Sequence, residues 1–164
     1  MFVVFAAASN PYRLLGSVFE QTELVTFVGV ETVVAVDPAT AAWVSGIKAA
    51  AERNNWQTGT LLIDLTGGTP GAAVVLTAQP PTTSWLVGGY KGSDEYVRYA
   101  LSQVDLRSLK SAWVLTAPGG LRSVSEEVLA SVELPFPEGY ILAGQMRTGH
   151  RDELQYLWKP QGTQ

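Results

Sequence analysis

Residues 60–70, TLLIDLTGGTP, carry the clearest structural signal in the chain. The first part, residues 60–65, is almost continuously apolar, which is typical of a central parallel strand covered on both faces. Residues 66–69 contain two adjacent glycines flanked by threonines, a composition that favours a loop. The small apolar side chains of residues 71–79 predict a helix. The segment is therefore a strand–loop–helix unit, the repeating element of α/β folds.

The rest of the chain repeats this alternation. Further strands are predicted at residues 2–7, 32–36, 83–88 and 111–116, and further helices at residues 10–20, 39–54, 94–104 and 123–131. Asn10 and Asp37 are candidate helix N-caps, and Ser123 with Glu126 resembles a capping box. Residues 139–146 and 153–159 predict a terminal β-hairpin. The pattern indicates an α/β, Rossmann-like, mostly parallel sheet flanked by helices, with a C-terminal β-hairpin.

The length of 164 residues fits a single domain. We expect residues 1–105 to form the Rossmann-like core and residues 106–164 to add a strand, a short helix and the hairpin. The amino terminus lacks the positive region of a signal peptide, and no apolar run approaches the roughly 20 residues of a membrane helix. The sequence therefore predicts a cytoplasmic protein without a membrane segment.

Composition limits the function. Charged residues make up 16% of the chain, below the usual ~25%, so we expect a homodimer that covers part of the surface. The net charge is −4 and no basic stripe is visible, which disfavours binding to long nucleic acids. The chain has no cysteine and a single histidine, so no metal site and no cofactor are expected.

The glycine loop, residues 66–69, is the leading candidate site. Adjacent glycines permit positive φ and close approach of a ligand to the backbone, and the first N–H groups of the following helix favour an anion. Neither a Walker loop nor a dinucleotide fingerprint is present. The alternative is that the glycines only let the chain reverse direction.

Residues 62–69, LIDLTGGT, resemble the signature loop of CARF domains (CRISPR-associated Rossmann fold). The resemblance covers about the first hundred residues. It implies a homodimer that binds a cyclic oligoadenylate, with cyclic tetra-adenylate expected, through Thr66, Gly67, Gly68 and Thr69. It also implies slow cleavage of that ring without a metal, as in ring nucleases. Pro70 departs from the family pattern, because many members have lysine there.

Three residues are candidates for the chemistry of ring cleavage. Ser9 and Asn10 end the first predicted strand and are expected to hold a ribose, although Asn10 also suits a helix cap. Lys91 is expected to stabilise charge on the phosphate oxygens, and its alternative is a solvated loop lysine. Ser93 and Arg122 are candidate ligand contacts, although Arg122 could instead pair with an acidic neighbour.

Two other functions remain open. The stretch from Asp64 to Pro70 also resembles the mannose-type phosphotransferase IIA domain. That family phosphorylates a histidine after its first strand, where this chain has none; His150 lies in the turn of the predicted hairpin. The alternative to a ring nuclease is a non-catalytic nucleotide-binding sensor that acts on another protein.

Overall fold

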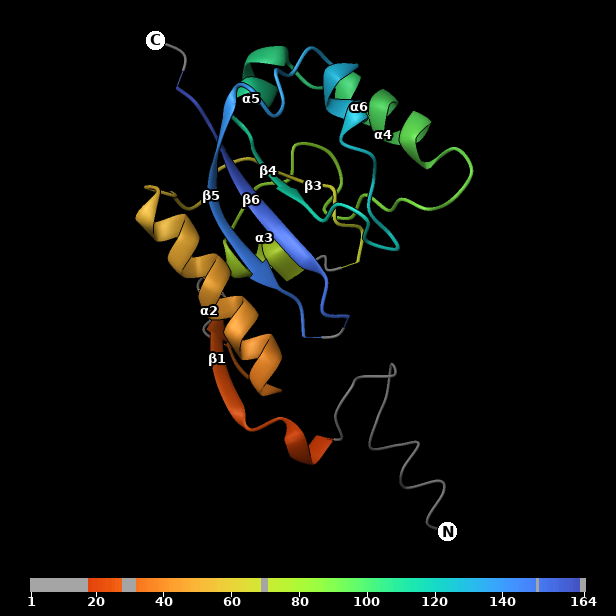
Figure 1. Ribbon diagram of the computed structural model, residues 1–164. Coiled ribbons are helices and arrows are strands. Elements are labelled where there is room, and N and C mark those ends of the chain that lie inside the picture. The colour runs from red at the N-terminus through yellow and green to blue at the C-terminus, as the bar shows by residue number, and fades with distance from the viewer. Residues whose placement is uncertain (1–17, 28–31, 69–70, 150, 163–164) are drawn as a thin grey trace.

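The computed structural model describes residues 18–27, 32–68, 71–149 and 151–162. A four-stranded sheet lies between two sets of helices (Figure 1). In spatial order its strands are β3 (Leu62–Asp64), β4 (Trp113–Thr116), β6 (Leu154–Pro160) and β5 (Tyr140–Arg147). The α/β class is therefore confirmed.

The sheet is mixed, so a mostly parallel sheet is not confirmed. β3 and β4 are parallel, with Ile63 opposite Val114, whereas β6 runs antiparallel to both β4 and β5. The predicted terminal hairpin is present as β5 and β6, but it pairs directly with β4 instead of forming a separate appendage. Half of the described sheet is therefore built by this one hairpin.

Two of the predicted strands do not join this sheet. Residues 32–36 form β2 (Thr32–Val36), which among the described residues pairs with β1 (Glu23–Phe27) as an antiparallel two-stranded sheet. Residues 83–88 form a loop, where the Trp85 indole N–H donates to the Gly67 carbonyl and the Gly88 N–H donates to the Arg122 carbonyl. These bonds to other loops replace a strand ladder. The predicted strand at residues 2–7 lies outside the described residues.

Helices cover both faces of the sheet (Figure 1). One face carries α2 (Pro38–Arg53) and α3 (Gly71–Val75), and the other carries α4 (Ser93–Ser102), α5 (Leu106–Ser111) and α6 (Glu127–Ala130). Asp37 caps α2 as expected, because its carboxylate accepts a hydrogen bond from the Thr40 N–H at 2.9 Å.

The helices differ from the sequence prediction at two places, α5 and the start of α6. The predicted capping box is wrong, since the Ser123 hydroxyl donates to the Ala117 carbonyl and α6 begins only at Glu127. The helix α5 was not predicted. Of the predicted helix at residues 10–20, the structure describes only the 3₁₀ turn η2 (Val18–Glu20).

Alternation along the strands divides the core into two clusters. Leu62 and Leu115 point toward α2 and α3, whereas Ile63 and Val114 point toward α4, α5 and α6. Each of these side chains is at most 2% exposed, and burial of one such side chain stabilises the fold by roughly 1.5–3 kcal/mol. The short strands β3 and β4 are therefore held by packing on both faces.

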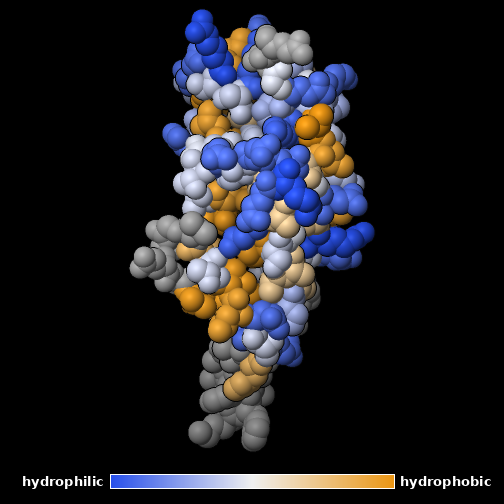
Figure 2. All heavy atoms as spheres, turned by 90° about the vertical axis from the view of Figure 1, so that its left-hand side faces the viewer, coloured by the Kyte–Doolittle hydropathy of each residue, from blue (hydrophilic) through white to orange (hydrophobic). Residues whose placement is uncertain are grey.

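The surface that carries α2 and the β1–β2 hairpin is partly apolar. Leu24 and Val33 are 74% and 56% exposed. Figure 2 shows hydrophobic residues gathered on the lower part of this side, in the region of the hairpin. Among the described residues, no helix is both long enough and apolar enough to cross a membrane.

Candidate functional site

The parallel strands β3 and β4 end at the same edge of the sheet, where α/β folds place their ligand sites. Three loops meet at this edge. The loop after β3 packs against residues 120–124, and the backbone N–H of Val124 donates to the carbonyl of Leu65. The loop at residues 86–90 joins them through the bond from Gly88 to Arg122. Two cavities open around this assembly, and they differ in chemistry.

The glycine loop begins with a closed local turn. Asp64 is buried at the end of β3, and one of its carboxylate oxygens accepts hydrogen bonds from the Thr66 N–H at 2.9 Å and from the Thr66 hydroxyl at 2.7 Å. Burial raises the pKa of Asp64 to about 6, although the two bonds from Thr66 oppose that rise. Thr66 is itself fully buried. Its hydroxyl is therefore engaged inside the protein.

The two glycines of the loop have different surroundings. Gly67 has a φ of +62° and is packed so tightly that an added Cβ would collide with the Arg122 carbonyl oxygen. Gly68 is exposed and does not have a positive φ, and its nearest neighbour would be a Glu153 carboxylate oxygen at 3.5 Å from an added Cβ. Gly67 serves the packing of the loops, whereas Gly68 faces open space.

That open space is a cavity of about 340 Å³, called here the apolar cavity. It lies between α2, α3, β1 and the β5–β6 turn. The described residues that line it are Phe27, Thr40, Trp43, Val44, Gly68, Gly71, Val75, Thr148, Gly149, Arg151 and Glu153. Most of its lining surface is carbon. The Trp43 indole N–H donates to the buried Gln155 side chain at 2.9 Å, which fixes the ring in the cavity wall.

The β5–β6 turn closes one side of the apolar cavity. Gly149 packs against the first turn of α2, since an added Cβ would lie 2.9 Å from the Thr40 nitrogen. Thr148 braces the other end of the turn: its N–H donates to the Glu153 carbonyl at 3.0 Å, and its hydroxyl accepts from the Glu153 N–H at 3.1 Å. These contacts fix the backbone from which the Arg151 and Glu153 side chains reach the cavity.

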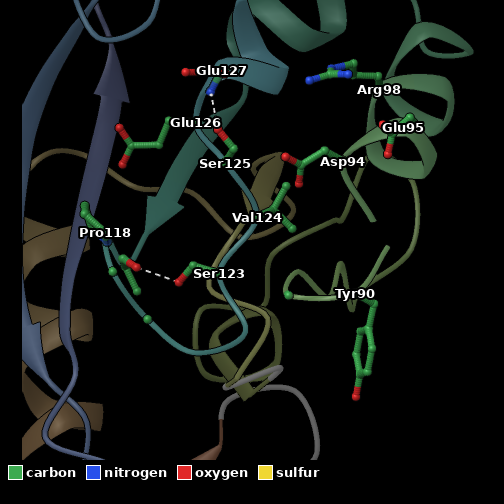
Figure 3. A pocket seen from close by; sticks show the side chains of 14 residues that line it. Tyr90, Asp94, Glu95, Arg98, Pro118, Ser123, Val124, Ser125, Glu126 and Glu127 are labelled. Atoms are coloured by element: carbon green, nitrogen blue, oxygen red, sulfur yellow. Dashed lines mark hydrogen bonds between the residues drawn. The ribbon is translucent and has the colours of Figure 1, made fainter. Parts of the chain in front are cut away.

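The second cavity, called here the acidic cavity, has a volume of about 700 Å³ and follows β4 (Figure 3). Four carboxylates line it, from Asp94, Glu95, Glu126 and Glu127, with Arg98 as the one lining cation among the described residues. In Figure 3, Arg98 points into the space between α4 and α6, and Glu126 points away from Asp94.

The carboxylates of the acidic cavity do not converge on one point. Within residues 18–27, 32–68, 71–149 and 151–162, no group of three or more acidic, histidine or cysteine side chains is placed to hold a metal ion. The excess of negative charge makes this cavity unfavourable for phosphate groups. Its size alone therefore does not make it the better candidate for a nucleotide.

The structure brings only some of the predicted site residues together. Thr66, Gly67 and Gly68 are consecutive, but only Gly68 lines a cavity. Two more lie near the acidic cavity: the Ser93 hydroxyl accepts from the Tyr90 N–H at 3.2 Å, and the Arg122 guanidinium lies 4.3 Å from the Tyr90 ring centre. Lys91, the next residue, is exposed on the same loop.

Three predicted site residues, Ser9, Asn10 and Thr69, lie outside the described residues, as does His150. The catalytic grouping of Ser9, Asn10 and Lys91 therefore stays a prediction, since only Lys91 belongs to the described residues.

Sequence reasoning missed Trp43, Arg151 and Glu153 as cavity residues. Trp43 belongs to the buried core, and its ring also lines the apolar cavity. The run of charges from Arg151 to Glu153 was visible, but nothing in the sequence shows that this turn folds against α2 and the glycine loop.

Comparisons with protein-family models, with curated proteins and with solved structures found no match to this chain. The site must therefore be interpreted from its own geometry.

Proposed function

We propose that this protein binds a cyclic oligoadenylate in the cytoplasm, with one adenine in the apolar cavity. The observation that carries the proposal is that this cavity opens directly onto Gly68. The loop with the CARF-like sequence thus borders a preformed hollow at the carboxyl end of a buried parallel strand.

The size and lining of the apolar cavity suit a nucleobase. Its volume of about 340 Å³ is at the lower end of the ~300–1,000 Å³ typical of small-molecule sites. Trp43, Val44 and Val75 supply apolar surface for the flat faces of a purine. A whole cyclic tetranucleotide is too large for this space, so its sugar–phosphate ring would remain at the mouth, where Arg151 is exposed.

A cyclic tetra-adenylate has more than one base, which suits a symmetric site made by two copies of the chain. The low fraction of charged residues, 16%, supports a homodimer. In this proposal the described α/β sandwich is a divergent Rossmann-like domain whose C-terminal hairpin has been added to the sheet.

Cleavage of the bound ring is the second part of the proposal. A ribose 2′-hydroxyl would attack its neighbouring phosphorus, and the P–O5′ bond would break. The products would be a 2′,3′-cyclic phosphate and a 5′-hydroxyl, with the hydroxyl proton passing to the leaving oxygen by way of water. Ser9 and Asn10 would orient the ribose, and Lys91 would offset charge on the phosphate.

Isothermal titration of the full chain with cyclic tri-, tetra- and hexa-adenylate tests binding, and chromatography of the same mixtures with EDTA tests cleavage. We expect saturable binding of at least one ring and slow appearance of 2′,3′-cyclic phosphate ends. Binding without any product would support the alternative, a non-catalytic sensor. No binding of any ring at millimolar concentration would refute the proposal.

A further inference from the structure

Among the described residues, Glu153 is the charged residue nearest to Gly68. Its side chain is only 15% exposed, and its Oε1 lies 3.9 Å from Nη1 of Arg151. The second oxygen, Oε2, faces Gly68, since it would lie 3.5 Å from a Cβ added there. A carboxylate oxygen is thus held at the wall of the apolar cavity, beside the backbone that the sequence suggested for a phosphate.

This placement argues against a phosphate at Gly68. A phosphate there would lie next to the Glu153 carboxylate, and two negative charges at such close range repel each other. The group that does suit this position is a hydrogen-bond donor, because an ionised carboxylate only accepts hydrogen bonds. The 3.9 Å between Arg151 and Glu153 is longer than a hydrogen bond. The Glu153 carboxylate can therefore still accept a hydrogen bond from a ligand.

The backbone that carries this carboxylate is held in place. Glu153 is the first residue after the turn and exchanges two hydrogen bonds with Thr148, at 3.0 and 3.1 Å. Its neighbour Asp152 accepts from the Arg147 guanidinium at 3.2 Å, which closes the turn on its outer side. A pre-organised acceptor costs little entropy when it binds its donor.

We infer that Glu153 selects the base in the apolar cavity by accepting a hydrogen bond from the exocyclic amino group of adenine. This inference rests on the proposed function and adds a specificity-determining residue to it. Hypoxanthine has the same shape as adenine but carries an oxygen where adenine has the amino group. That oxygen would face the carboxylate, so two hydrogen-bond acceptors would lie against each other with no donor between them.

Titration calorimetry with cyclic tetra-adenylate and cyclic tetra-inosinate tests the inference on the full chain. We expect the wild-type protein to prefer the adenylate by about tenfold or more, since a base site with an unpaired buried acceptor loses at least that much affinity. Glu153→Gln should reduce the preference to below about threefold, because the amide can also donate to the oxygen of hypoxanthine. Glu126→Gln, in the acidic cavity, is the matched control and should keep the wild-type preference.

Thermal melts of each variant separate loss of recognition from loss of fold, and Glu153→Asp, which withdraws the carboxylate without removing its charge, provides a second test. A preference retained in Glu153→Gln, or equal affinity of the wild type for both rings, would overturn the inference while leaving nucleotide binding intact. If the wild-type protein binds neither ring, the proposed function fails as well.

Discussion

The apolar cavity and the acidic cavity lie beyond neighbouring parallel strands, yet their chemistry differs sharply. The apolar cavity follows β3 and is lined mainly by carbon, with one cation and one carboxylate at its edge. The acidic cavity follows β4, is about twice as large, and has four carboxylates to one arginine. A position at the carboxyl edge of the sheet therefore does not by itself determine what a site binds; the side chains contributed by adjoining loops do.

Gly67 packs against the backbone of Arg122, so the largest expected effect comes from Gly67→Ala. A Cβ there would collide with the Arg122 carbonyl oxygen, and alanine is strained at a φ of +62°. Urea denaturation should show that the free energy of unfolding falls by roughly 3 kcal/mol or more.

Gly68→Ala is the matched control for this substitution. Its Cβ meets Glu153 Oε2 at an ordinary 3.5 Å, so we expect a change below about 1 kcal/mol. Similar losses in both variants would show that the loops are not packed as described.

The next largest effect, a pH-dependent change in stability, is expected at Asp64. Its carboxyl is buried, unlike the carboxylates that line the acidic cavity. Its folded-state pKa of about 6 is above the ordinary 3.8, so the folded state holds the proton more tightly than the unfolded state. The resulting stabilisation is complete below pH 3.8 and is lost as the pH rises through 6. Between low and high pH, this one group changes the free energy of unfolding by at most about 3 kcal/mol.

Asp64→Asn should remove this pH dependence while its side-chain oxygen still accepts hydrogen bonds from Thr66. Urea denaturation of both proteins at pH 4 and pH 7.5 checks the prediction. The variant should gain stability relative to the wild type at the higher pH. An identical difference at both pH values would mean that Asp64 is not desolvated.

The fold could be predicted where local sequence determined it. The α/β class, the helix capped by Asp37 and the terminal hairpin all follow from apolar periodicity and turn residues. The mixed sheet could not be predicted, because insertion of β6 beside β4 depends on long-range packing. Residues 83–88 have a strand-like sequence, but their backbone bonds to neighbouring loops instead.

The candidate site, like the fold, could be predicted from the sequence only in part. The sequence indicated the loop at residues 66–69, but it did not distinguish Gly67, which is needed for packing, from Gly68, which borders the cavity. It also gave no sign of Glu153, whose approach to Gly68 exists only in the folded chain. Charge alone favours Lys91 and Arg122 as ligand contacts, but both lie in loops on the side of the acidic cavity.

The smallest effect is expected in the acidic cavity. Glu95→Gln removes one carboxylate that lies outside the apolar cavity, and charges separated by solvent are screened over roughly 8 Å in physiological salt. Its affinity for cyclic tetra-adenylate should therefore stay within about twofold of the wild type, as measured by calorimetry. A tenfold or larger gain would indicate that the ligand binds in the acidic cavity.

The most direct test of the account is the affinity of Gly68→Val for cyclic tetra-adenylate, compared with the wild type and with Ser125→Val in the acidic cavity. The Cβ of valine at residue 68 would lie 3.8 Å from the Thr66 carbonyl oxygen, an ordinary contact, so the fold should persist by circular dichroism. Its methyl groups would narrow the apolar cavity beside Glu153. We expect affinity to fall by about tenfold or more in Gly68→Val and to be unchanged in Ser125→Val. Wild-type affinity in a folded Gly68→Val protein would contradict the assignment of the apolar cavity as the binding site.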